Sequence, residues 1–265
     1  MAEYGLLGEK LSHSFSPQIH AQLADYDYQL ISLPPEKLDG FLREKQFRGL
    51  NVTIPYKKAV IPYLDELSPA ARRIGAVNTI VNRGGRLFGD NTDYAGLKYA
   101  IKRAGICLSG KKVLILGSGG TSKTAHAAAE DLGAREIFTI SRSGEDNYQN
   151  LSRHADAQII LNTTPVGMFP QNGQAPLGLE QFPHLEGVAD AIYNPLKTAL
   201  LLEAEELGIP YTNGLPMLVA QAKAACEVFL QKSISAEKTE QILSSLERQL
   251  KSVVFVGMPG SGKTT

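Results

Sequence analysis

The chain has 265 residues, of which 43% are hydrophobic and 20% are charged, and these proportions predict a globular protein with a sizeable buried core. Lys and Arg together number 27, as do Asp and Glu, so the sequence lacks the positive excess typical of nucleic-acid binding. The sequence has no apolar run of about 18 residues, which argues against a membrane span. The first residues lack the basic region and long apolar run of a signal peptide, so we expect none, and Cys107 and Cys226 fit no metal-ligand spacing. We therefore expect a cytoplasmic protein without a bound metal.

Short apolar runs alternate with helical patterns along most of the chain, and this alternation predicts an α/β fold with mainly parallel sheets. The runs that predict strands are Tyr4–Leu7, Tyr28–Leu33, Leu50–Ile54, Lys112–Leu116, Glu136–Ser141, Gln158–Asn162 and Val188–Ala191. The predicted helices include Pro17–Asp25, Pro35–Gln46, Tyr94–Ala104, Thr121–Leu132 and Ser235–Leu250. We also expect one hairpin, with strands Ala76–Val81 and Arg86–Gly89 and a turn at residues 82–85. We expect the boundary between two structural units of the chain near residues 94–109.

Two serines precede the first predicted helix. Ser14 and Ser16 lie next to Pro17, which is typical of the first position of a helix. Their hydroxyls have two possible uses: they cap the helix, or they bind a carboxylate at its N-terminus.

Three further polar segments interrupt apolar patterns in the first half of the chain. Thr53 and Lys57 follow a predicted strand, Asn78 lies within the predicted hairpin, and Asp93 begins a predicted helix. Asp93 has an alternative role as a helix cap. Together these residues supply an ammonium group, a carboxylate and neutral hydrogen-bonding groups, a set that suits a small polyhydroxylated substrate and a proton transfer.

A glycine-rich turn, Gly117-Ser118-Gly119-Gly120, lies between a predicted strand and a predicted helix. Glycines there allow a pyrophosphate to approach the backbone, and the helix N-terminus attracts it, so the pattern predicts dinucleotide binding. Ser122 replaces the usual third glycine, and an ordinary strand–helix turn is the alternative. The next predicted strand ends at Ser141-Arg142-Ser143, where an acidic residue would favour NAD. Arginine instead favours NADP, unless Arg142 is only a solvated surface residue.

The polar motifs occur in an order that resembles the shikimate dehydrogenase family. They are Ser-His-Ser-Phe-Ser-Pro at residues 12–17, Asn-Val-Thr-Ile-Pro-Tyr-Lys at 51–57, Gly-Ala-Val-Asn-Thr at 75–79 and Gly-Asp-Asn-Thr-Asp at 89–93. Asn-Thr-Thr-Pro-Val-Gly-Met at 162–168, Asp-Ala-Ile-Tyr-Asn-Pro at 190–195 and Gly-Leu-Pro-Met-Leu-Val-Ala-Gln at 214–221 continue the resemblance. It covers residues 1–250.

The resemblance implies NADPH-dependent, reversible reduction of 3-dehydroshikimate to shikimate, a step toward chorismate and the aromatic amino acids. It implies that Ser14 and Ser16 bind the substrate carboxylate. It also implies that Thr53, Asn78, Asp93 and Gln221 bind ring hydroxyls and that Lys57 and Asp93 form the catalytic pair. The implied cofactor-binding residues are Gly117, Ser118, Gly119, Gly120, Ser141, Arg142, Ser143, Thr163, Tyr193, Gly214 and Met217.

The implied fold has two lobes, an N-terminal α/β substrate-binding lobe and a Rossmann-like NADP-binding lobe. The first comprises residues 1–96 and is completed by helices in 216–250, and the second comprises 97–215. The resemblance also implies a monomer or homodimer. Relatives often carry a second basic residue near Asp146, where this chain has Gly144-Glu145-Asp146, so we expect weakened discrimination against NAD.

The last residues carry a different motif. Gly257-Met258-Pro259-Gly260-Ser261-Gly262-Lys263-Thr264 satisfies the phosphate-loop pattern after an apolar run and resembles the start of a shikimate kinase. Residues 251–265 are therefore expected to be the truncated start of a kinase-like domain in a longer fusion protein. The alternative functions are an NAD(P)-dependent quinate/shikimate dehydrogenase, a phosphotransferase and an inactive nucleotide-binding module.

Overall fold

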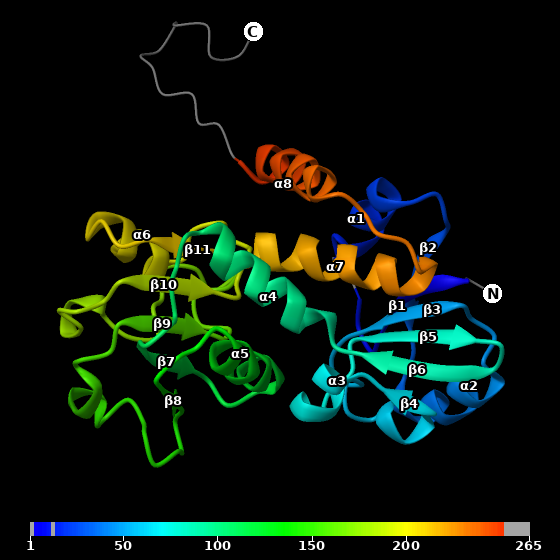
Figure 1. Ribbon diagram of the computed structural model, residues 1–265, viewed down its shortest axis with the longest axis horizontal. Helices are drawn as coiled ribbons and strands as arrows, with labels where there is room; N and C mark the ends of the chain where they lie inside the picture. Colours follow the sequence, from blue (N-terminus) through cyan, green and yellow to red (C-terminus); the bar gives the residue numbers. More distant parts are fainter. Residues whose placement is uncertain (1–2, 12–13, 252–265) are drawn as a thin grey trace, which may run out of the picture.

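The computed structural model describes residues 3–11 and 14–251, which form two β-sheets connected by long helices (Figure 1). The N-terminal sheet has the strand order β2-β1-β3-β5-β6-β4, and the second has the order β11-β10-β9-β7-β8. The strands of the first sheet are β1 (Tyr4–Gly8), β2 (Tyr28–Ser32), β3 (Gly49–Val52), β4 (Glu66–Leu67), β5 (Thr79–Arg83) and β6 (Arg86–Asp90). Those of the second are β7 (Lys112–Leu116), β8 (Glu136–Ile140), β9 (Ile159–Asn162), β10 (Gly187–Asp190) and β11 (Tyr211–Thr212).

The helices connect and cover these sheets. They are α1 (Ser16–Leu23), α2 (Leu38–Glu44), α3 (Pro69–Ile74), α4 (Thr92–Arg103), α5 (Gly120–Asp131), α6 (Ala199–Glu206), α7 (Leu215–Leu230) and α8 (Ala236–Leu250). Short 3₁₀ turns are η1 (Pro35–Lys37), η2 (Ile61–Tyr63), η3 (Leu151–His154) and η4 (Leu179–Gln181). The predicted α/β class is confirmed. In the described part of the chain, no helix has both the length and the apolar character of a membrane span.

The first sheet is mixed rather than parallel throughout. Strand β1 pairs in parallel with β2 and β3, whereas β3, β5 and β6 pair antiparallel. The predicted hairpin is present, but its turn is shorter than expected. Gly84 and Gly85 take φ values of +61° and +87°, which suit a two-residue turn, so Arg83 pairs directly with Arg86. The expected strand from residue 76 was too long, because Asn78 lies just before β5.

The second sheet is parallel in all its pairings and is covered on both faces. Alternate side chains of β7 point to opposite faces: Val113 and Ile115 pack in a cluster with α5. Leu114 and Leu116 pack on the other face in a cluster that includes residues of α6. Burial on both faces explains why this strand is an uninterrupted apolar run.

Helices α4 and α7 lie side by side and connect the two sheets (Figure 1). They approach closely at Gly96, where an added Cβ would be 2.5 Å from the carbonyl oxygen of Met217. Met217, at the start of α7, packs against the cluster between α5 and the second sheet. Phe229, near the end of α7, packs against Tyr4 of the first sheet. The helix therefore spans from one sheet to the other and fixes their relative position.

Candidate active site

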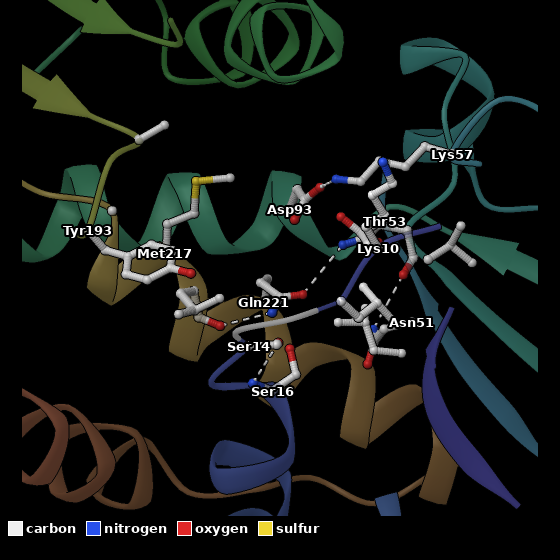
Figure 2. A pocket seen from close by; sticks show the side chains of 17 residues that line it. Lys10, Ser14, Ser16, Asn51, Thr53, Lys57, Asp93, Tyr193, Met217 and Gln221 are labelled. Atoms are coloured by element: carbon white, nitrogen blue, oxygen red, sulfur yellow. Dashed lines mark hydrogen bonds and ion pairs between the residues drawn. The ribbon is translucent and has the colours of Figure 1, made fainter. Parts of the chain in front are cut away.

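A cavity of about 330 Å³ lies where α1, the end of β3, α4 and α7 meet (Figure 2). Ten of the residues expected at the site from the sequence line it, and they come from α1, α4 and α7 and from loops next to both sheets. They are Ser14, Ser16, Thr53, Lys57, Asn78, Asp93, Tyr193, Gly214, Met217 and Gln221.

Lys57 and Asp93 form an ion pair at this cavity, with 2.6 Å between Lys57 Nζ and Asp93 Oδ2 (Figure 2). The side chains are only 28% and 17% exposed, so water screens the pair less than it would at the surface. The backbone carbonyl of Lys57 accepts a hydrogen bond from Val77 N (2.7 Å), which holds the lysine segment next to β5. The alternative role of Asp93 as a helix cap is wrong, because Asn91 is the N-cap residue of α4. The pair can deliver a proton from the ammonium group to a ligand.

Asn78 connects three elements beside this pair. Its Oδ1 accepts a hydrogen bond from Thr92 N (2.7 Å), so it satisfies a backbone donor at the N-terminus of α4. Its Nδ2 donates to Thr92 Oγ1 (3.1 Å) and Gln221 Oε1 (3.5 Å). Asn78 is buried at 3% exposure, and this network fixes which of its polar atoms face the cavity.

Ser14 and Ser16 lie at the start of α1, and neither is its N-cap residue. The N-cap residue is Phe15, whose own side chain makes no capping hydrogen bond. Ser14 Oγ accepts from Ser16 N (3.1 Å), which brings both hydroxyls to the same end of the cavity (Figure 2). Two hydroxyls at a helix N-terminus form a neutral site suited to a carboxylate.

Two further polar residues line the cavity, Asn51 and Lys10, and neither was expected there from the sequence. Tyr28 OH donates to Asn51 Oδ1 (2.7 Å), and the His20 ring stacks on Tyr28 with 3.9 Å between ring centroids. Burial lowers the pKa of His20 to about 3, so this histidine is neutral. Its ring supports Tyr28, which in turn positions Asn51. Asn51 was detectable in the sequence, since it lies two residues before Thr53 and so on the same side of an extended segment. Lys10, in a loop, gave no such signal.

The glycine-rich turn connects β7 to α5 as expected. Gly117 has a φ of +102°, and an added Cβ would be 3.0 Å from Thr163 Oγ1, so the position requires glycine. At Gly119 and Gly120 an added Cβ would meet nothing within 4 Å, so open space lies beside the backbone at the N-terminus of α5. That space and the free N–H groups fit a pyrophosphate.

The other expected cofactor residues lie at the carboxyl ends of neighbouring strands. Ser141, Arg142 and Ser143 follow β8, and Thr163 follows β9. These residues, with Gly117, Ser118 and Gly119, do not line the first cavity. A second cavity of about 190 Å³ includes Gly120 together with Lys57 and Asp93. The ion pair therefore lies between the polar cavity and the glycine-rich turn.

Comparisons with known proteins agree with this geometry. Residues 6–80 match the family model described as the shikimate dehydrogenase substrate binding domain. The shikimate dehydrogenase (NADP(+)) of Clostridium beijerinckii is 33% identical over 95% of this chain and 100% of its own length. The chain belongs to the shikimate dehydrogenase family.

Solved structures of family members have the same fold. A chorismate mutase/shikimate 5-dehydrogenase fusion protein from Clostridium acetobutylicum has a TM-score of 0.90 and 35% identity, covering 95% of this chain and 99% of that one. The shikimate 5-dehydrogenase of Thermus thermophilus, solved with NADP(H) and shikimate, has a TM-score of 0.83 and 33% identity, covering 92% and 99%. The expected kinase-like start at residues 251–265 gains no support from these matches, and residues 252–265 lie outside the described part of the chain.

Proposed function

We propose that this family member is an oxidoreductase that catalyses the NADP-dependent, reversible reduction of 3-dehydroshikimate to shikimate in the shikimate pathway. The observation that carries this proposal is the Lys57–Asp93 ion pair between a polar cavity and a glycine-rich turn. The cavity supplies hydroxyl, amide and carboxylate groups, which suit a small ring with several hydroxyls and one carboxylate.

The substrate carboxylate is bound by the Ser14 and Ser16 hydroxyls at the start of α1. The ring hydroxyls are bound by Thr53, Asn78, Asp93 and Gln221, with Asn51 as an addition to that set. A substrate held by these residues has its carbonyl group directed toward Lys57. The supporting observation is that all these residues line one cavity.

Lys57 donates the proton that the carbonyl oxygen acquires during reduction, and its charge stabilises the negative charge developing on that oxygen. Asp93 orients the ammonium group through its 2.6 Å contact. In the oxidation direction Lys57 accepts the proton of the hydroxyl.

When bound, NADPH supplies the hydride. The backbone of Gly117, Ser118, Gly119 and Gly120 would hold its pyrophosphate, and Arg142 with Ser141 and Ser143 would hold its 2′-phosphate. Thr163, Tyr193, Gly214 and Met217 would line the nicotinamide side. An added Cβ at Gly214 would be 2.1 Å from Ala191 O, so the two backbones approach closely where these residues meet.

We also propose that the chain divides into two lobes, one for the substrate and one for the cofactor. Residues 1–96 with 216–250 would form the substrate-binding lobe, and 97–215 the NADP-binding lobe. Separate hydrophobic clusters on the two sheets support this division. We further propose that the protein is cytoplasmic and is a monomer or homodimer. Size-exclusion chromatography with light scattering would test the oligomeric state.

The deciding experiment measures reduced nicotinamide by absorbance, with shikimate or quinate as substrate and NADP⁺ or NAD⁺ as cofactor. We expect the highest turnover with shikimate and NADP⁺, and its loss in Lys57→Ala. Faster turnover with quinate or NAD⁺ would instead favour the quinate/shikimate dehydrogenase alternative. No turnover by folded protein with any pairing would favour an inactive nucleotide-binding module.

The phosphate-loop pattern at residues 257–264 favours one additional candidate function. In a longer parent protein it would bind ATP in a kinase-like domain. ATP-dependent phosphorylation of shikimate by the product of the full reading frame would support this, and a reading frame without a kinase-like continuation would exclude it.

A further inference from the structure

The loop between β8 and η3 carries Arg142 and also an acidic residue, Asp146. The loop folds back on the end of β8, because Ser141 N donates to the backbone carbonyl of Asp146 (3.2 Å). Gly144 allows this, since an added Cβ there would be 2.7 Å from Ser141 Oγ. Asp146 is thus held next to the segment that would bind the 2′-phosphate.

The carboxylate of Asp146 has a defined partner away from this segment. Its Oδ1 lies 2.8 Å from Nε2 of His154 and 3.8 Å from Nη1 of Arg153, both on η3. His154 is buried at 4% exposure and packs on the Phe138 ring of β8, with 4.5 Å between centroids. A carboxylate only accepts, so Nε2 carries the proton, and the buried Nδ1 has no partner among the described residues.

The rest of the loop is tied to itself and to the core. Asn147 N donates to Asn150 Oδ1 (2.9 Å), and Asn150 Nδ2 donates to the carbonyl of Glu145 (2.9 Å). Tyr148 packs against the hydrophobic cluster of the second sheet. Burial raises the pKa of Tyr148, and the positive charge of Arg142 acts in the opposite direction.

We propose that Asp146 and His154 are positioning residues for cofactor selectivity: their hydrogen bond holds the 141–150 loop in the shape that presents Arg142 to a 2′-phosphate. This rests on the proposed NADP-dependent function. A free carboxylate near Arg142 would repel the phosphate, as the acidic residue of NAD-binding sites does. Because His154 holds the Asp146 carboxylate, this group instead helps to keep the loop in the shape that presents Arg142. Asp146 thus contributes to NADP binding even though it carries the wrong charge for a direct contact.

The test compares dissociation constants of NADP⁺ and NAD⁺, measured by calorimetry, for wild type and three variants. Asp146→Ala removes the acceptor, Asp146→Asn keeps an acceptor without the charge, and His154→Phe keeps the contact with Phe138 without the donor. We expect Asp146→Ala and His154→Phe to weaken NADP⁺ binding about fivefold to tenfold, the factor for one lost hydrogen bond, with NAD⁺ binding unchanged. Asp146→Asn should stay close to wild type.

Several results would overturn this inference. Tighter NADP⁺ binding in both Asp146 variants would mean that the carboxylate acts as a repulsive charge. Equal weakening of NADP⁺ and NAD⁺, together with a lower melting temperature, would mean a role in stability alone. Turnover with shikimate, measured in parallel on wild type, reports on the proposed function separately, because the calorimetric comparison requires no catalysis.

Discussion

Lys57 Nζ and Asp93 Oδ2 lie 2.6 Å apart although 36 positions separate the two residues in the chain. Lys57 follows β3, and Asp93 lies in the first turn of α4. Asn78, which lies outside α4, accepts a hydrogen bond from Thr92 N at the N-terminus of this helix. The Asp93 carboxylate is therefore not needed as a cap and is free to pair with the lysine.

Removing either member of this pair should abolish most of the catalysis without removing the cofactor site. We expect Lys57→Ala to lower kcat about 100- to 10,000-fold, the usual contribution of a positioned proton donor. Asp93→Asn should lower kcat less, since Lys57 remains. The dissociation constant of NADPH, measured by fluorescence, should stay within about twofold of wild type, because a donor to the substrate contributes little to cofactor affinity. An unchanged kcat in Lys57→Ala would exclude the proposed proton donor.

Replacing Arg142 should alter cofactor choice and leave the chemistry intact. A charge-assisted hydrogen bond contributes about 1.5–3 kcal/mol, so Arg142→Gln should raise KM for NADP⁺ roughly 10- to 100-fold. KM for NAD⁺ and for shikimate should not change. Steady-state kinetics with both cofactors check this. If KM for NADP⁺ does not respond, Arg142 is a solvated surface residue.

The close approach of α4 and α7 should be sensitive to a single methyl group. Gly96→Ala would place a Cβ 2.5 Å from Met217 O, so the helices must separate, at a cost of about 1–3 kcal/mol of unfolding free energy. KM for shikimate should also rise, because Asp93 and Gln221 lie on these two helices.

Gly40→Ala is the matched control. Gly40 lies in α2, and an added Cβ there would meet nothing within 4 Å, so this variant should raise the free energy of unfolding by up to about 1 kcal/mol. Urea unfolding of both variants measures the contrast, and equal effects would contradict it.

Asp190 should make stability depend on pH. Burial raises its pKa to about 6 from 3.8, against hydrogen bonds from Ile192 N, Thr198 Oγ1 and Asn162 Nδ2 that lower it. Between these values the folded state binds a proton that the unfolded state has lost. Stability from this group is therefore present below pH 3.8 and lost as the pH rises through 6, by about 3 kcal/mol in total.

The measurement is urea unfolding of wild type and Asp190→Asn at pH 4 and pH 7. His20 acts in the opposite sense, because its folded pKa of about 3 lies below its unfolded value of 6.5, and it cancels in the difference between the two proteins. We expect wild type to lose stability relative to Asp190→Asn between these pH values. A constant difference would show that the carboxylate is not desolvated.

Most secondary structure was predictable from local chemistry. The apolar run Lys112–Leu116 was assigned to its observed bounds, because a strand covered on both faces needs no alternation. Helices α3 and α6 went unassigned although Ser68 and Thr198 cap them, because each is short and lies in a mixed segment. The predicted helix at residues 35–46 divides into η1 and α2, and nothing in its polar pattern marked that boundary.

The sequence by itself determined the α/β class and the glycine-rich turn, and it predicted ten of the residues that line the cavity, because each of these depends on neighbouring residues or on a motif. Only the tertiary structure decided the 2.6 Å contact between Lys57 and Asp93, the position of Lys10 at the cavity and the hydrogen bond between Asp146 and His154. These relationships join segments whose separation is set by the packing of α4 against α7 and of the β8 loop against η3. Local propensity cannot encode such distances, because they arise only when whole elements pack.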